Sequence, residues 1–250
     1  MLTDPALLAV LGWQTLAIVC LGGFLGGMAS GAAGFAYGMV ASTIWLHAID
    51  PLHMAMLVVS GGMIIQTRLV WRMRRSIDGK RLAPFVIAGL AGVPIGVALV
   101  VKTDPGAVRF WLALFLTTYG LYALLAPRLP RIEGGGKAAD AVAGFLGGVG
   151  GGLAGLSGIA PAIWTQLRGW PKDMARGVFQ PFIMVMHVAT LLLIGAFAFD
   201  LFAVVLFIAV APATLLGGWV GWMIYGKLSE RQFQQMFAGM MVVSGVLLML

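Results

Sequence analysis

One glycine-rich phrase occurs twice in this chain, and each copy interrupts an apolar segment. The first copy reads Gly23-Phe24-Leu25-Gly26-Gly27-x-x-x-Gly31-x-Ala33-Gly34, and the second reads Gly144-Phe145-Leu146-Gly147-Gly148-x-x-x-Gly152-x-Ala154-Gly155. Glycine lets one backbone approach another backbone, or a ligand, more closely than any other residue. The repetition predicts two related halves, at about residues 7–126 and 138–250, within one domain that spans residues 1–250.

The composition places this chain in a membrane. Hydrophobic residues make up 60% of the sequence and charged residues only 10%, a balance that cannot provide a water-facing surface. We therefore expect an all-α integral membrane protein. The single cysteine, Cys20, excludes an intrachain disulfide and a cysteine-cluster metal site.

The apolar runs divide into two sets of five, and two of them are too short to span a bilayer. A hydrocarbon core about 30 Å thick needs about 20 helical residues. The runs 32–46 and 156–168 fall short of that and are expected to be re-entrant or broken half-helices. Residues 7–46 must either double back or cross twice. The ten runs are 7–28, 32–46, 52–71, 83–101, 107–126, 138–154, 156–168, 178–198, 201–224 and 232–250.

The basic residues predict how the segments are oriented, because Lys and Arg concentrate in cytoplasmic loops. Strict alternation places all of them except Lys102 and Arg109 on one side, which we take to be the cytoplasmic side of the cell inner membrane. Both chain ends of this multi-pass protein are then non-cytoplasmic. The net charge of +7 is explained by topology and contact with anionic lipid, so no nucleic-acid partner is expected.

The same topology predicts that the two halves are inverted relative to each other. The loop after the first phrase, at 47–51, faces outward, whereas its counterpart at 169–176 faces inward. Two further matches support the pairing: Pro51-x-x-Met54-Ala55 with Pro171-x-x-Met174-Ala175, and Gly92 and Gly96 with Gly217 and Gly221. Inverted-topology repeats provide two arrangements of similar energy that open to opposite sides, which is the basis of alternating access.

The paired glycine phrases, in a chain of this length with basic loops, resemble the TauE/SafE family of sulfite and organosulfonate exporters over essentially the whole sequence. The resemblance implies a membrane transporter that moves a small anion, with export as the implied direction. The second phrase, which continues through Ser157, Gly158 and Pro161, is closer to the family pattern. The first phrase continues through Phe35 and Tyr37, so it is either a less open site or mainly a packing element.

The residues themselves also point to an anion. A short helix is expected to begin inside the membrane after each glycine cluster, near Phe35 and Ile159, and helix N-termini attract negative charge. Polar residues inside membrane segments usually face a cavity or another helix. The alternative is that the glycines only permit close helix packing. The predicted substrate-binding residues are Gly31, Gly34, Gly152, Gly155, Ser157, Gly158, Gln180, His187 and Gln66.

The placement of acidic and histidine residues argues against other classes of function. All nine carboxylates fall in expected loops or at segment ends, which disfavours a cation site. No nucleophile arrangement or metal-ligand spacing is present, so we expect neither an enzyme nor a metal or other cofactor. Proton coupling through His187, a homo-oligomer, an anion channel or passive carrier, and a non-transporting membrane partner protein remain open alternatives.

Overall fold

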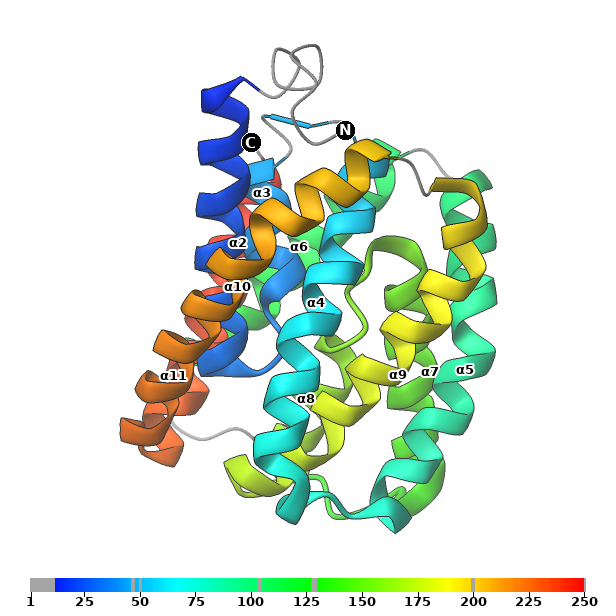
Figure 1. Ribbon diagram of the computed structural model, residues 1–250. Coiled ribbons are helices and arrows are strands. Elements are labelled where there is room, and N and C mark those ends of the chain that lie inside the picture. The colour runs from blue at the N-terminus through cyan, green and yellow to red at the C-terminus, as the bar shows by residue number, and fades with distance from the viewer. Residues whose placement is uncertain are drawn as a thin grey trace.

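The protein is built from helices. The computed structural model describes residues 12–45, 48–49, 51–102, 105–126, 130–198 and 201–249, and these residues form helices, turns and irregular segments without a strand. The elements are α2 (Trp13–Ala33), α3 (Tyr37–Trp45), α4 (Pro51–Met73), η1 (Arg74–Ser76), α5 (Gly79–Lys102), α6 (Pro105–Leu125), α7 (Gly136–Ala154), α8 (Ile159–Leu167), α9 (Lys172–Ala198), α10 (Leu201–Lys227) and α11 (Glu230–Met249). The expected all-α fold is confirmed (Figure 1).

The helices have the length and surface of membrane spans. Within the described residues, α2, α10, α11 and parts of α5 and α9 are long and apolar enough to cross a bilayer. Large apolar side chains lie on the outer surface of the bundle, with Ile87 72% exposed and Leu192 77% exposed. In water such a surface would be unfavourable, but in hydrocarbon it is the expected lipid contact. The chain is an all-α membrane protein.

The two short helices double back along the helices that precede them. With nine residues each, α3 and α8 extend about 14 Å, roughly half of a hydrocarbon core. The indole N–H of Trp45, at the end of α3, donates to the Val19 carbonyl in α2 at 2.9 Å. That of Trp164 in α8 donates to Asp140 Oδ1, near the start of α7, at 2.7 Å. Of the two alternatives for the first segment, doubling back is therefore the one observed.

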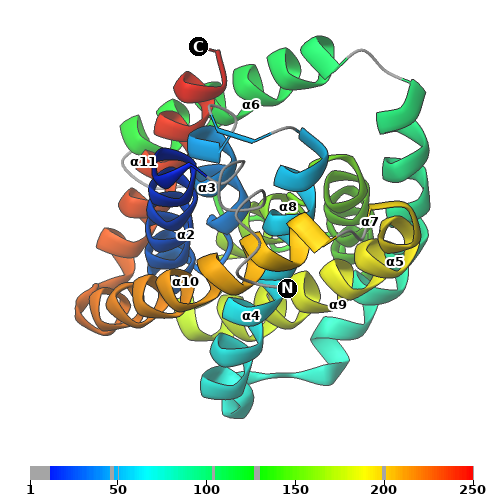
Figure 2. The same ribbon diagram turned by 45° about the horizontal axis from the view of Figure 1, so that its top comes forward.

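Each glycine-rich helix packs on a long helix from the other half of the sequence. Helix α2 lies against α10, and α7 lies against α5, as Figure 2 shows on opposite sides of the bundle. A Cβ added to Gly31 would collide with the Gly218 carbonyl oxygen, and one added to Gly152 with that of Val93. Helices approach this closely in membranes where small residues line both faces. Helices α4 and α9 cross and pack against each other in the centre of the bundle, between these two helix pairs.

The loops that carry most of the basic residues lie together at one end of the molecule, at the bottom of Figure 1. The Ile132 N–H donates to the Leu167 carbonyl at 2.8 Å, and the Lys172 N–H donates to Glu230 Oε2 at 2.9 Å. These contacts join three of the loops that alternation of the segments assigns to one side. We call this end of the molecule the basic end.

Candidate functional site

Both glycine phrases end at a break between two helices, and a glycine makes each break possible. Gly34 follows α2 with φ +95°, and its N–H donates to the Ser30 carbonyl at 2.7 Å. Gly155 follows α7 with φ +69°, and its N–H donates to the Gly151 carbonyl at 2.9 Å, while the Leu156 N–H donates to the Gly150 carbonyl at 3.1 Å. A residue with a side chain is strained in the left-handed conformation, so glycine is the residue that usually ends a helix in this way.

The two breaks lie against each other in the interior. A Cβ added to Gly158 would lie 2.7 Å from Phe35 Cβ, and one added to Gly38 would lie 3.8 Å from the Gly155 carbonyl oxygen. The first turns of α3 and α8, which begin at Tyr37 and Ile159, therefore meet. We call this meeting point the break junction.

At the second break a helix N-terminus and a buried hydroxyl lack partners. Among the described residues, no side chain caps the N-terminus of α8 at Gly158. The Ser157 side chain is completely buried, and its Oγ has no hydrogen-bond partner in the described part of the chain. Buried hydroxyls are almost always hydrogen-bonded, because leaving one unpaired costs about 1–3 kcal/mol. Free backbone N–H groups beside such a hydroxyl form a donor set suited to an oxyanion.

Two side chains from the crossing helices reach the breaks in the same way. Gln66 Nε2, on α4, donates to the Gly34 carbonyl at 2.9 Å, 32 residues further along the chain. His187 Nε2, on α9, lies 3.4 Å from the Gly155 carbonyl, also 32 residues further along. Since a carbonyl only accepts, this contact puts the imidazole proton on Nε2. Gln66 Oε1 and His187 Nδ1 have no partner among the described residues.

The first break also holds a buried cation. Arg176, on α9, is fully buried, and its Nη1 and Nη2 donate to the carbonyls of Ala32 and Gly31 at 3.2 and 3.1 Å. In the amide orientation that satisfies both side chains, Gln180 Oε1 accepts from Arg176 Nη2 at 2.6 Å. The guanidinium also lies over the Tyr225 ring, 4.0 Å from its centroid. Within the described ranges, no carboxylate lies within ion-pair distance of Arg176.

Arg176 was not among the predicted site residues. The apolar run that marks its helix begins at residue 178 in the sequence, so Arg176 was assigned to a loop. Helix α9 begins six residues earlier than that run, at Lys172. The usable signal was Gln180, which lies one helical turn from Arg176 on the same face. A polar residue inside the apolar run, one turn after an arginine, indicates that the arginine belongs to the same helix and lies on its polar face.

The structure brings most of the predicted site residues to the break junction. Gly34, Gly155, Ser157 and Gly158 form the breaks, and Gln66 and His187 contact them. Gln180 lies beside Arg176.

Gly31 and Gly152 have a different position. Their α-carbons face α10 and α5, as the close-packing alternative expects, although the Gly31 carbonyl accepts from Arg176. Both remain predictions as substrate ligands.

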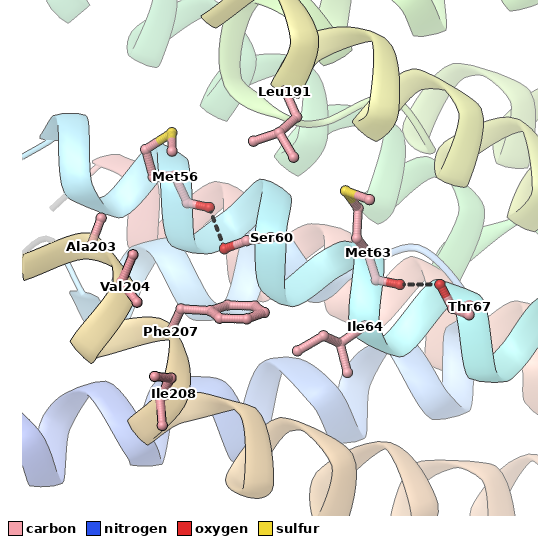
Figure 3. A pocket seen from close by; sticks show the side chains of 10 residues that line it. All are labelled: Met56, Ser60, Met63, Ile64, Thr67, Leu191, Ala203, Val204, Phe207 and Ile208. Atoms are coloured by element: carbon pink, nitrogen blue, oxygen red, sulfur yellow. Dashed lines mark hydrogen bonds between the residues drawn. The ribbon is translucent and has the colours of Figure 1, made fainter. Parts of the chain in front are cut away.

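A cavity of about 590 Å³ lies between α4, α9 and α10 (Figure 3), and its walls are apolar. Its polar side chains are Ser60 and Thr67, whose hydroxyls donate to Met56 and Met63 in their own helix at 2.6 and 2.8 Å. Such hydroxyls are already satisfied. This cavity therefore offers an anion no free donor, in contrast to the break junction.

The acidic residues lie away from the break junction. The described carboxylates, namely Asp78, Glu133, Asp140, Asp173 and Glu230, all lie in loops or near the first turn of a helix at the basic end. No group of three or more His, Cys, Asp or Glu side chains that could hold a metal ion occurs in the described part of the chain.

Comparison with known proteins agrees with this architecture. The family model described as "Sulfite exporter TauE/SafE" matches residues 19–248. No curated protein and no solved structure matches the chain. A match over nearly the whole sequence makes the assignment independent of any single motif, and we conclude that the chain belongs to the TauE/SafE sulfite exporter family, a family of membrane transporters.

Proposed function

We propose that this protein is a secondary transporter that carries a small oxyanion, sulfite or an organosulfonate, through the break junction. The observation that carries the proposal is the contact between two helix breaks beside a buried, unpartnered hydroxyl at Ser157. Family membership supports a sulfur-containing anion as substrate. The apolar cavity between α4, α9 and α10 is a weaker candidate, since the two hydroxyls that line it already donate within their own helix.

The charges near the break junction favour an anion over a cation. The N-termini of α3 and α8 each contribute about half a positive charge. Arg176 adds a full charge that makes no ion pair with a described carboxylate, and Asp173 attracts it only from a longer distance. A buried cation without a direct ion pair is costly, and a membrane-embedded charge is most often functional. An incoming oxyanion would lower that cost. The role of Arg176 is to set a positive potential at the break junction, because its N–H groups already hold α2 and Gln180.

The helix pairing supports alternating access by two inverted-topology repeats. Since α2 packs on α10 and α7 packs on α5, each re-entrant hairpin belongs with a long helix of the opposite half. Movement of one such unit against the other across the α4–α9 crossing would open the break junction to alternate sides. We assign the basic end to the cytoplasm of a cell with an inner membrane. Export is the proposed direction, and both termini are then non-cytoplasmic.

The proposal is tested by sulfite flux into proteoliposomes that contain the purified full chain. We expect saturable flux in the unmodified protein. In Ser157→Ala it should fall about tenfold, because one hydrogen bond to a charged group is worth about 1.5 kcal/mol. The control is Ser60→Ala, whose hydroxyl donates to its own helix, and it should transport normally.

Three results would overturn or change the proposal. Equal flux in Ser157→Ala and the unmodified protein would remove the break junction as the site. Absence of flux for sulfite, sulfate and short organosulfonates alike would favour a non-transporting partner role. Conductance that does not saturate would replace the carrier by a channel.

A further inference from the structure

A second cavity, which is polar, lies at the basic end, apart from the break junction. Its volume is about 390 Å³, and it is formed where the starts of α5 and α7 meet the segment after α8. These elements come together at the bottom of Figure 1. Four cationic side chains line the cavity, Lys80, Arg81, Lys137 and Arg168. We call it the basic-end pocket.

The two arginines of this pocket are held in place by the protein. Arg168 Nη1 donates to the carbonyls of Glu133 and Gly134 at 3.3 and 3.2 Å, and its Nε lies 4.0 Å from Asp140 Oδ1. Arg81 Nε donates to Asp78 Oδ2 at 3.1 Å.

Trp170 lies between the two arginines. Its ring centroid is 5.2 Å from the Arg81 guanidinium carbon and 5.7 Å from that of Arg168. The arginines and this tryptophan therefore form a preorganised wall, and the carboxylates of the pocket already have partners.

The two lysines are free by comparison. The side chains of Lys80 and Lys137 are exposed, and neither ammonium group makes a hydrogen bond or an ion pair in the described part of the chain, although the Lys80 backbone N–H donates to Asp78 Oδ1. The pocket thus contains four cations and two carboxylates, and the excess positive charge belongs to the lysines. Such a combination of guanidinium groups held by the protein and unpaired ammonium groups suits a phosphate, whose oxygens accept from several donors at once.

The position of the pocket points to the membrane surface. It lies at the ends of α5 and α7, whose outer faces carry exposed apolar side chains such as Ile87 and Val142, 72% and 60% exposed. A phospholipid with its headgroup in the pocket could lay its acyl chains along these helices. Basic pockets between membrane helices on the cytoplasmic side are a common form of anionic lipid site.

We propose that the basic-end pocket binds the phosphate group of an anionic phospholipid. Inorganic phosphate from solution offers the same chemistry, and the test separates the two sources. The delipidated full chain in detergent micelles is titrated with phosphatidylglycerol, phosphatidylcholine or inorganic phosphate, and binding is followed by tryptophan fluorescence and melting temperature. The double variant Lys80→Gln/Lys137→Gln is compared with Lys227→Gln/Arg231→Gln, which removes the same charge at the same end but outside the pocket.

We expect phosphatidylglycerol to bind and phosphatidylcholine to bind far more weakly. Removing both lysines should weaken phosphatidylglycerol binding about 25-fold, at about fivefold for each lysine, and the control variant should bind normally. Phosphate binding that is lost only in Lys80→Gln/Lys137→Gln would support the pocket but assign it to the free ion. Equal losses in both double variants, or no loss in either, would overturn the proposal.

Discussion

The two helix breaks have the same backbone conformation but differ in the side chains around them. At each break a glycine in the left-handed conformation ends a long helix, and a side chain 32 residues further along contacts the glycine carbonyl. The first break is filled by Phe35 and by the buried Arg176, which holds two carbonyls of α2. The second break has Ser157 and Gly158 instead, with a helix start that no described side chain caps. A buried hydroxyl without a partner among the described residues lies near each break, Ser30 at the first and Ser157 at the second.

This difference suggests a division of labour between the breaks. The repeated glycine phrase determines where the helix breaks, while the residues after it determine which side chains surround the break. Arg176 neutralises the negative end of the α2 dipole and rigidifies the first break. The second break keeps its donors free. We therefore assign the first break mainly to structure and potential, and the second to contact with the substrate.

The largest effect is expected from filling the break junction. In Gly158→Leu the new side chain would meet Phe35 and Ile183, since even a Cβ would lie 2.7 and 2.5 Å from their atoms. Sulfite flux in proteoliposomes should fall at least 100-fold, while the protein still inserts into the membrane. Gly239→Leu is the control because no atom of the described residues lies within 4 Å of its Cβ position. Normal flux through Gly158→Leu would show that the substrate takes another path.

The next effect concerns the first break. Arg176→Gln removes the donors to Gly31 and Ala32 and leaves Gln180 without its partner. Loss of these buried contacts should lower the free energy of unfolding by about 3 kcal/mol, and the melting temperature in detergent by roughly 10 °C. The exposed Arg231→Gln serves as the control. An unchanged melting temperature in Arg176→Gln would contradict the structural role of the first break.

A smaller effect compares the two side chains that contact the glycine carbonyls. Gln66→Leu and His187→Leu each leave one buried carbonyl without its side-chain donor. Each variant should therefore lower the free energy of unfolding by about 1–2 kcal/mol, measured by thermal unfolding. Similar losses are expected because the two contacts are alike. If only one variant lost stability, the two breaks would not be equivalent in their backbone capping.

The smallest change in stability is expected from His187→Gln, which gives the second break the same donor as the first. The Gln amide can replace the Nε2 contact, so the free energy of unfolding should change by less than about 1 kcal/mol. If His187 carries the coupling proton, the acceleration of sulfite flux by an imposed pH gradient should disappear, because an amide does not titrate. A retained response to the gradient would exclude His187 as the coupling group.

The sequence predicted the elements better than their partners. The doubled phrase located both breaks within a few residues, and the basic loops that alternation assigned to one side lie at one end of the molecule. Periodicity could not show that Gly31 and Gly152 face α10 and α5, since that depends on which helices meet across the bundle. Arg176 escaped prediction because its helix begins with polar residues, Lys172 and Asp173, that read as a loop. The common spacing of Gln66 and His187 was visible in the sequence, but its meaning required the glycine carbonyls.

The central claim, that the substrate passes the second break, is tested most directly by the accessibility of Ser157. A Ser157→Cys variant, with Cys20→Ala to remove the native thiol, is treated in oriented vesicles with a membrane-impermeant methanethiosulfonate from each side in turn. We expect labelling from both sides, slowed by a short organosulfonate such as taurine. A thiol that stays unlabelled from both sides, or that is labelled at the same rate with the organosulfonate present, would contradict it.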